Sequence, residues 1–295
     1  MNPLPLDALN KADRQIFTAA VGEVMELAPW VAEETFAKRP FAGISALYQT
    51  MTDAVRNAPP ERRQALISGH PDLAGKAARE GNLTADSAAE QAAAGLDKLS
   101  EQEFANFHRL NDAYRQKFAM PFIICVRRHG KQSILREFER RLKNDTTAEQ
   151  KAALAEIFRI AALRLDQRVK ASDRLNVHGH LSTHVLDVHS GRPAQGVEIE
   201  LCEIVGSGAT RVIKRAQTNA DGRTDAPLFS GMPVPIATYE LHFAVADYFA
   251  KARAPMADPP FLDIVPVRFS VAEPEGRYHV PLLVTPWSYS TYRGS

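Results

Sequence analysis

The sequence predicts two domains, an all-α helical domain followed by an all-β sandwich. Apolar residues recur with helical spacing as far as about residue 170, and from about residue 181 they alternate with polar residues at a period of two. A chain of 295 residues also holds enough apolar material for two hydrophobic cores. We therefore expect a helical domain at 1–170, a linker at 171–180 and a sandwich at 181–295.

The composition is that of a soluble globular protein. The chain is 45% hydrophobic and 24% charged, with a formal net charge of +1, and neither half is strongly basic. We therefore expect neither nucleic acid nor a membrane surface as a partner. The two cysteines, Cys125 and Cys202, lie in apolar runs of different halves, which is typical of buried thiols in a reducing compartment and not of a disulfide scaffold.

Local start signals place the helices of the first half. In each signal a serine or threonine precedes a helical stretch as its N-cap. In two of them a glutamate or glutamine follows three residues later and completes a capping box. They are the boxes Ser100–Glu103 and Thr147–Gln150 and the N-cap Thr84, ahead of helices at 101–118, 148–169 and 85–96. The apolar run PFIICVR at 121–127 is too short for a surface helix, so we expect a buried extended segment or the start of a core helix.

Alternating runs separated by turn residues predict seven or eight strands in the second half. Val197, Ile199 and Leu201 alternate with glutamates, which is the pattern of a half-buried strand. A short helix at 244–252 interrupts the strands. Six of the expected strands lie at 181–188, 196–205, 210–219, 238–245, 261–271 and 278–286.

Histidines gather at the start of this second half. His178 and His180 have a spacing that can supply two metal ligands, so a zinc hydrolase is one alternative, although no further ligand follows at a familiar spacing. Period two places His184 on one face of its strand with Ser182, and it places His279 at the start of the last strand. A single histidine in such a position is usually a satisfied core or rim residue.

Polar residues in the first half share helix faces. Ser87, Glu90 and Gln91 are three and four residues apart on an alanine-rich helix, so they lie on one face. Arg164 lies at the edge of an apolar stripe and needs an anionic partner, either Glu90 or a ligand carboxylate. His70 precedes Pro71, which favours an extended backbone there.

The second half resembles 5-hydroxyisourate hydrolase, the transthyretin-like enzyme of urate breakdown. The resemblance rests on LSTHVLDVHSGRPAQGV, TNADGRTDAPL and the ending YHVPLLVTPWSYSTYRGS. It implies a transthyretin-like sandwich that assembles as a homotetramer, with active sites at the dimer–dimer interface and no metal. It also implies that His184 and His279 flank the water and substrate, that Arg223 stabilises charge, and that the chain end completes the pocket through Tyr292, Arg293, Gly294 and Ser295.

The first half resembles 2-oxo-4-hydroxy-4-carboxy-5-ureidoimidazoline (OHCU) decarboxylase. The resemblance rests on PWVAE, HPDLAGKA, LTADSAAEQAAAGL, LNDAYRQKF, PFIICVR and FERRL. It implies cofactor-free decarboxylation, with His70 as the acid/base and Glu90 as its partner. The substrate-binding residues that it implies are Pro71, Ser87, Gln91, Phe122, Ile123, Ile124 and Arg164. The chain has KFAMPFI where the family usually has KFGFPFI, so we expect altered packing at Ala119 and Met120.

Together the two resemblances imply a bifunctional enzyme that converts 5-hydroxyisourate into (S)-allantoin. The small-molecule substrates would be 5-hydroxyisourate and OHCU, and dimer contacts in the helical domain are an open alternative. A transthyretin-like carrier with a helical interaction domain is the alternative function. The segment RLNVHGHL at 174–181 is one residue short of a peroxisomal signal, so we expect a cytoplasmic protein.

Overall fold

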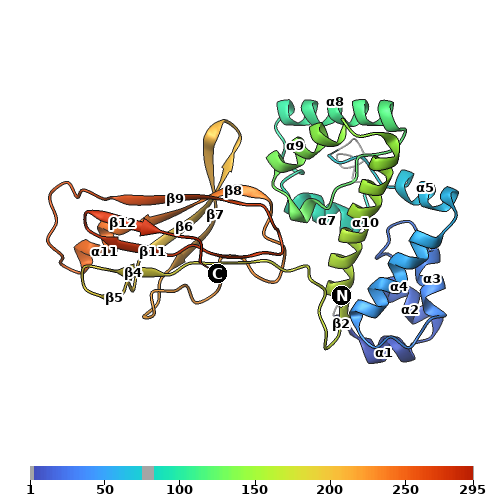
Figure 1. Ribbon diagram of the computed structural model, residues 1–295, viewed down its shortest axis with the longest axis horizontal. Helices are drawn as coiled ribbons and strands as arrows, with labels where there is room; N and C mark the ends of the chain where they lie inside the picture. The colour runs from blue at the N-terminus through green and yellow to red at the C-terminus, as the bar shows by residue number, and fades with distance from the viewer. Residues whose placement is uncertain (1–2, 75–82, 295) are drawn as a thin grey trace. The chain divides into compact units, whose positions relative to one another are not determined.

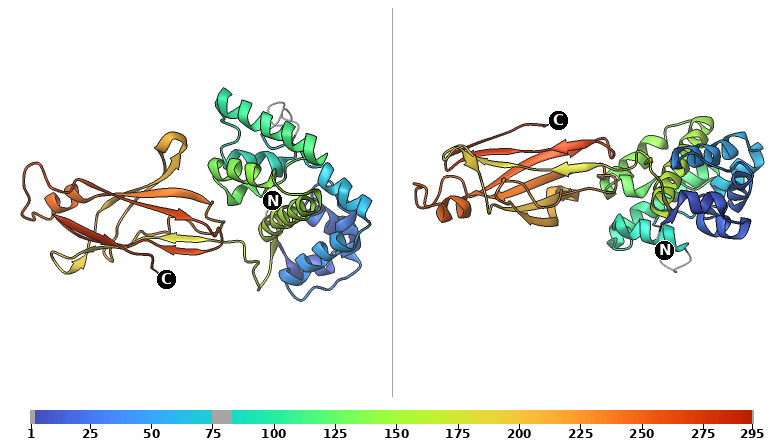
Figure 2. Two further views of the ribbon diagram at one scale, coloured as in Figure 1. Left: turned by 45° about the horizontal axis from the view of Figure 1, so that its top comes forward. Right: turned by 90° about the horizontal axis from the view of Figure 1, so that it is seen from below.

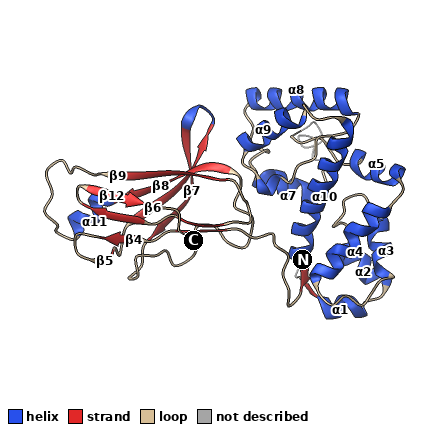
Figure 3. Cartoon of the chain, viewed as in Figure 1, coloured by secondary structure: helices blue, strands red, loops and turns tan. Residues whose placement is uncertain are grey.

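The chain folds into two compact units (Figure 1), and the computed structural model describes residues 3–74 and 83–294. The first unit runs up to Arg127 and resumes at Ser133–Val177, and the second comprises Arg128–Gln132 and the chain from His178 onward. Each unit has its own hydrophobic core. Figure 3 shows that the first is built from helices and the second mainly from strands, as the two periodicities predict. The division after Val177 falls inside the expected linker, whereas Arg128–Gln132 groups with the second unit.

The first unit is helical almost throughout. A short parallel pair of strands, β1 (Leu4–Pro5) and β2 (Val169–Lys170), joins the start of the described chain to the end of the last helix. None of the described helices is long and apolar enough to cross a membrane. The helices are α1 (Leu6–Lys11), α2 (Arg14–Val21), α3 (Pro29–Phe36), α4 (Ile44–Asn57), α5 (Pro60–Ser68), α7 (Ala85–Ala93), α8 (Glu101–Phe118), α9 (Lys131–Arg141) and α10 (Thr146–Arg168), with a 3-10 turn at Val126–Arg128.

The predicted helix starts are confirmed at two of three positions. Ser100 and Glu103 form both hydrogen bonds of a capping box at α8, and the Thr84 hydroxyl accepts from the Ser87 N–H at the start of α7. The box predicted at Thr147 is wrong. The α10 helix begins two residues earlier, where the Asp145 carboxylate accepts from the Ala148 N–H at 2.8 Å, because aspartate is at least as good an N-cap as threonine.

The apolar run at 121–127 is a buried extended segment, the first of the two alternatives, and it enters a 3-10 turn at Val126. Buried backbone groups outside a helix or sheet still need hydrogen-bond partners. Here two long side chains supply them. Arg141 donates to the Ile123 carbonyl at 2.6 Å, and Glu156 accepts from the Cys125 N–H at 2.9 Å.

The second unit is a sandwich of two four-stranded sheets, with orders β12-β11-β4-β5 and β7-β6-β8-β9. Figure 2 shows the strands of this unit from two further sides. Its core is formed by apolar residues from both sheets. The short helix predicted at 244–252 is confirmed as α11 (Val245–Lys251). The strands are β3 (His180–Ser182), β4 (Val185–Asp187), β5 (Arg192–Pro193), β6 (Glu198–Val205), β7 (Ala209–Gln217), β8 (Ala237–Ala244), β9 (Ile264–Val271), β10 (Arg277–His279), β11 (Leu282–Thr285) and β12 (Ser288–Thr291).

Two adjacent strands of the sandwich are interrupted at the same level. The run predicted as one strand at 181–188 is split into β3 and β4, and the run at 278–286 is split into β10 and β11. The two halves pair in parallel, β3 with β10 and β4 with β11. His184 therefore lies at the break between strands, while the predicted alternation survives, since Leu181, Thr183 and Val185 are buried.

Candidate active sites

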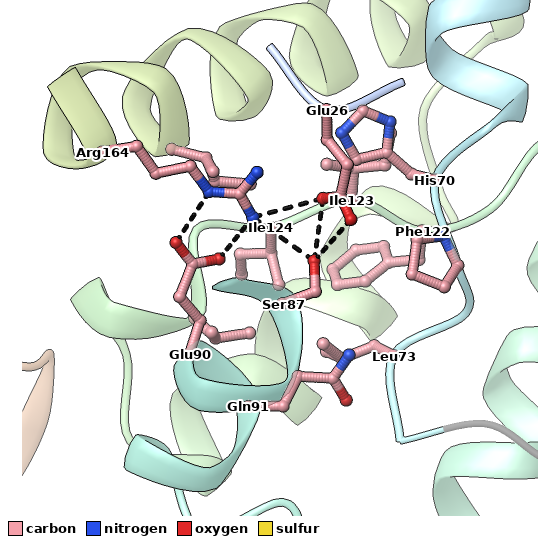
Figure 4. Close-up of a pocket in the computed structure, with 13 residues that line it drawn as sticks. Glu26, His70, Leu73, Ser87, Glu90, Gln91, Phe122, Ile123, Ile124 and Arg164 are labelled. Carbon is pink, nitrogen blue, oxygen red and sulfur yellow. Dashed lines mark hydrogen bonds and ion pairs between the residues drawn. The ribbon is translucent and has the colours of Figure 1, made fainter. Parts of the chain in front are cut away.

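A pocket in the first unit brings together all the residues that the sequence analysis singled out there (Figure 4). Two α-helices and three segments outside the α-helices contribute to it. The His70 side chain follows the end of α5, Ser87 and its neighbours lie on α7, and Arg164 lies on α10. The lining residues are Glu26, His70, Pro71, Leu73, Ser87, Glu90, Gln91, Phe122, Ile123, Ile124, Val126, Ile160 and Arg164.

Helix α7 turns its polar face inward. Ser87 and Gln91 are buried and Glu90 is half-buried, whereas Ala88 and Ala89 are exposed. The shared face predicted from spacing is therefore correct, and it faces the pocket and not solvent. Burial of polar groups is costly unless they are hydrogen-bonded, so these side chains must be held by specific partners.

The principal partner is the Arg164 guanidinium, which is 3% exposed. It donates to both oxygens of Glu90, at 2.9 and 2.8 Å, and to Oε2 of Glu26 at 3.2 Å (Figure 4). The planar fork of arginine suits such bidentate contacts. The anionic partner expected for Arg164 is thus provided by the protein. A substrate carboxylate that reaches it has to share it with two glutamates.

Glu26 is the residue that the sequence analysis missed. It lies between α2 and α3, is 5% exposed, and accepts from Ser87 Oγ at 2.8 and 2.9 Å and from Thr84 Oγ1 at 2.5 Å. Burial raises the pKa of Glu26, but the hydrogen bond from Thr84, the charge of Arg164 and the Ser87 hydroxyl outweigh it, so the pKa is lowered. The available signal was an acidic residue inside the apolar run VMELAPW.

His70 is set up as a neutral base. Its Nδ1 lies 2.8 Å from the Leu66 carbonyl, which can only accept, so Nδ1 carries the proton and Nε2 has a lone pair. Burial lowers the pKa of His70, and this outweighs the opposing effects of the Leu66 carbonyl and of Glu26 and Glu90. His70 is therefore neutral at pH 7.

The second unit places His184 beside Arg223 through the backbone. The two residues form an isolated antiparallel bridge, and the Val185 N–H donates to the Gly222 carbonyl at 2.8 Å. Asn219 shapes this turn by accepting from the N–H groups of Asp221 and Arg223. Gly222 has φ +71°, and a side chain there would meet the Val185 carbonyl at 2.4 Å, so only glycine fits the approach.

His184 carries a buried polar atom without a hydrogen-bond partner. Its Nε2 is inaccessible to solvent and unpaired within the described part of the chain. Such atoms are rare in native structures and often mark a site that binds a ligand or water. Burial and the nearby charge of Arg223 lower the pKa of His184, so the ring is neutral at pH 7.

His279 lies at the end of β10 and is held on two sides. Its Nδ1 is 3.0 Å from Ser182 Oγ, and its carbonyl accepts from the Gly294 N–H at 2.9 Å. A side chain at position 294 would meet the His279 ring at 2.7 Å, so the glycine allows the chain end to lie against the histidine. Burial, Arg223 and His184 lower the pKa of His279.

The rest of the predicted hydrolase site is only partly brought together within one chain. Tyr292 is 58% exposed, and the Arg293 guanidinium lies over the Tyr278 ring at 5.2 Å. Ser295 lies outside the described residues. Among the described residues, the side chains grouped as possible metal ligands do not include His178 or His180, so the zinc-hydrolase alternative gains no support.

Comparison with known proteins identifies a family for each of the two units. The sequence model of the OHCU decarboxylase family matches residues 10–166, and that of the HIUase/transthyretin family matches residues 181–294. A 5-hydroxyisourate hydrolase from Deinococcus radiodurans is 57% identical over 118 residues, which are 40% of this chain and 98% of the relative. A 2-oxo-4-hydroxy-4-carboxy-5-ureidoimidazoline decarboxylase from Halalkalicoccus jeotgali is 39% identical over 167 residues, which are 57% of this chain and 93% of the relative.

One solved structure extends over both units. A crystal structure of (S)-allantoin synthase covers 99% of this chain and is itself covered over 100% of its length, with 30% sequence identity and a TM-score of 0.50. The order of the two units along the chain is therefore shared with a protein of known structure.

Proposed function

Because the chain belongs to the OHCU decarboxylase family over residues 10–166 and to the HIUase/transthyretin family over residues 181–294, we propose that it is a bifunctional enzyme of urate breakdown. The second unit hydrolyses 5-hydroxyisourate to OHCU, and the first unit decarboxylates OHCU to (S)-allantoin. The observation that carries this proposal is that each unit holds its own cluster of neutral histidine and charged side chains.

In the hydrolase unit, a neutral histidine can activate water. The unpartnered Nε2 of His184 is placed to accept a hydrogen bond from water or substrate, and His279 is oriented by Ser182. Arg223 provides positive charge for the oxyanion that forms as water adds to the ring carbonyl. Proton transfer from water to imidazole completes the nucleophile, and the same proton can then pass to the leaving nitrogen.

In the decarboxylase unit, the pocket supplies acid–base chemistry beside an apolar wall. The electrons of the breaking C–C bond delocalise into the adjacent conjugated system of the substrate as CO2 leaves. Neutral His70 can take the proton of the substrate hydroxyl as that C–O group becomes a carbonyl, and return a proton to one face of the neighbouring ureido-bearing carbon, which gives a single enantiomer. Phe122 and Ile124 form an apolar surface that favours conversion of the charged carboxylate into neutral CO2.

We also propose that the protein is a cytoplasmic homotetramer, assembled through the sandwich, and that neither step needs a cofactor. The assembly is supported by the open second site, in which Tyr292 is exposed and a neighbouring subunit could cover it. The location is supported by the missing residue in the signal-like segment at 174–181.

The test is a chiral assay of allantoin made from fresh 5-hydroxyisourate. His279→Ala should slow the loss of 5-hydroxyisourate, because the hydrolase loses a base. His70→Ala should leave that loss fast and let OHCU accumulate and decay to racemic allantoin. If both variants gave the same outcome, the assignment of one step to each unit would be wrong.

A further inference from the structure

A third cluster of reactive side chains lies on the sheet β7-β6-β8-β9. Among the described residues, Glu200, Cys202 and His242 each offer one donor atom, and these atoms all lie within 4.8 Å of one another. None of the three belongs to either candidate active site.

The strand register explains why these side chains meet. Glu200 pairs with His242, and Cys202 pairs with Glu240, across the antiparallel strands β6 and β8. Residues two apart on a strand share a face, so all four lie on the same side of the sheet. The arrangement is thus built into two long central strands and not into a loop.

The spacing of the two softer donors fits a shared metal ion. Cys202 Sγ lies 3.8 Å from His242 Nδ1. Bonds of about 2.3 Å to sulfur and about 2.0 Å to nitrogen place two donors of a tetrahedral Zn²⁺ about 3.5 Å apart. Only a small side-chain adjustment is needed to bring both donors onto one ion.

The ring of His242 is held in the orientation that a metal ligand needs. Its Nε2 lies 2.7 Å from Oε2 of Glu240, and Glu240 is held in turn by Arg268 Nε at 2.6 Å. An ionised carboxylate only accepts, so Nε2 carries the proton and the lone pair of Nδ1 faces Cys202. A carboxylate on the far nitrogen is the usual partner of a metal-bound histidine.

A third ligand and an entry path are also present. Arg215 Nε donates a hydrogen bond to Oε1 of Glu200 at 2.8 Å, which leaves Oε2 of the same carboxylate to bind an ion. A groove lined by Glu200, Arg215 and His242 gives solvent access, while Cys202 itself is only 1% exposed.

We propose that Glu200, Cys202 and His242 bind one divalent transition-metal ion, with Zn²⁺ as the best fit and water as the fourth ligand. Thiolate, imidazole and carboxylate together favour Zn²⁺ over Mg²⁺ or Ca²⁺, which prefer oxygen ligands. The ion joins β6 to β8 in the middle of the sheet and stabilises the sandwich.

The test uses the full-length, untagged, reduced protein titrated with Co²⁺ as a spectroscopic stand-in for Zn²⁺. The wild type should show a thiolate-to-cobalt charge-transfer band that saturates at one ion per chain and is removed by Zn²⁺. Cys202→Ser should abolish the band, and Glu240→Ala should weaken binding by about tenfold or more, because the histidine loses its orienting carboxylate. Cys125→Ser, which removes the other buried cysteine, is the matched control and should keep the band.

The proposal is overturned if the wild type gives no such band, or if the band persists in Cys202→Ser, which would reveal adventitious binding elsewhere. His242→Gln keeps the experiment decisive if Cys202→Ser does not fold. Zn²⁺ should raise the unfolding temperature of the wild type and of Cys125→Ser but leave that of His242→Gln unchanged. An equal rise in all three would also contradict the site.

Discussion

At the scale of single residues, the decarboxylase pocket is organised by charge balance around one buried arginine. Arg164 and Glu26 are nearly inaccessible to water and Glu90 is half-buried, so these ionised groups depend on one another for hydrogen bonds. Glu26 connects Arg164 to the hydroxyls of Thr84 and Ser87, because its carboxylate accepts hydrogen bonds from all three side chains. Glu26 is therefore a positioning residue for Ser87 and Arg164, which the resemblance assigns to substrate binding.

Glu26→Gln tests this position. Glutamine keeps the shape of the side chain but removes its charge, so we expect the first unit to lose about 1–3 kcal/mol of stability. We also expect decarboxylation to slow by about tenfold or more, because the carboxylate shared by Ser87 and Arg164 is replaced by a neutral amide with only one acceptor oxygen. Hydrolysis of 5-hydroxyisourate in the same sample should be unchanged.

The matched control is Glu23→Gln, which makes the same change at a side chain that is 84% exposed. Calorimetry and the two enzyme assays should show it to be close to the wild type. Equal behaviour of the two variants would mean that Glu26 has no special place in the pocket.

At the scale of elements, the end of α8 carries strain. Ala119 is the C-terminal cap of this helix and has φ +54°, in the left-handed region that favours glycine. This is the position where the decarboxylase family usually has glycine. A residue with a Cβ atom pays about 1–2 kcal/mol for that conformation. The structure therefore gives a physical meaning to the one departure from the family pattern.

Ala119→Gly should stabilise the first unit by about 0.5–1 kcal/mol, because relief of strain exceeds the extra chain entropy of glycine. Ala37→Gly is the control, since Ala37 caps α3 in the right-handed region with φ −70° and should lose stability instead. Calorimetry of both variants measures the two effects. The transition of the first unit is recognised as the one at which decarboxylase activity is lost on heating. Effects of the same sign would contradict the explanation.

Much of this element structure could be predicted because it is set locally. Helix starts depend on one cap and a few neighbours, and the alternation around His184 depends only on period two. The break between β3 and β4 could not be predicted, because the run LSTHVLDV contains neither glycine nor proline and the interruption is shared with the neighbouring strand. Glu26 was missed because its partners are 58 and more residues away along the chain.

At the scale of the whole molecule, the two active sites keep their histidines neutral by the same means. Burial is the largest cause of the lowered pKa at His70, His184 and His279, although they lie in unrelated folds. Both reactions need a proton acceptor, so one chain can run both steps over the same range of pH.

Each step should therefore keep its activity below pH 6.5, the ordinary histidine value, and lose it only as pH falls through the lowered pKa of its own histidines. The sign follows from the neutral form being the active one. Separate pH–rate profiles of the two steps measure this. An acid limb centred above pH 6.5 for either step would show that the pKa of its histidine is not lowered. Activity that instead falls as pH rises through this range would show that the histidine acts in the charged form.

The wall of the first pocket has a consequence for how the enzyme could acquire new substrates. The backbone of segment 121–127 is held by hydrogen bonds to the side chains of Arg141 and Glu156. Ile124 lines the pocket and takes no part in those backbone contacts, whereas the Phe122 ring lies under the Arg141 guanidinium and stacks on Phe138. Substitution at Ile124 can therefore reshape the cavity while the backbone keeps its path, which makes this position a natural place for selection, or an engineer, to alter specificity.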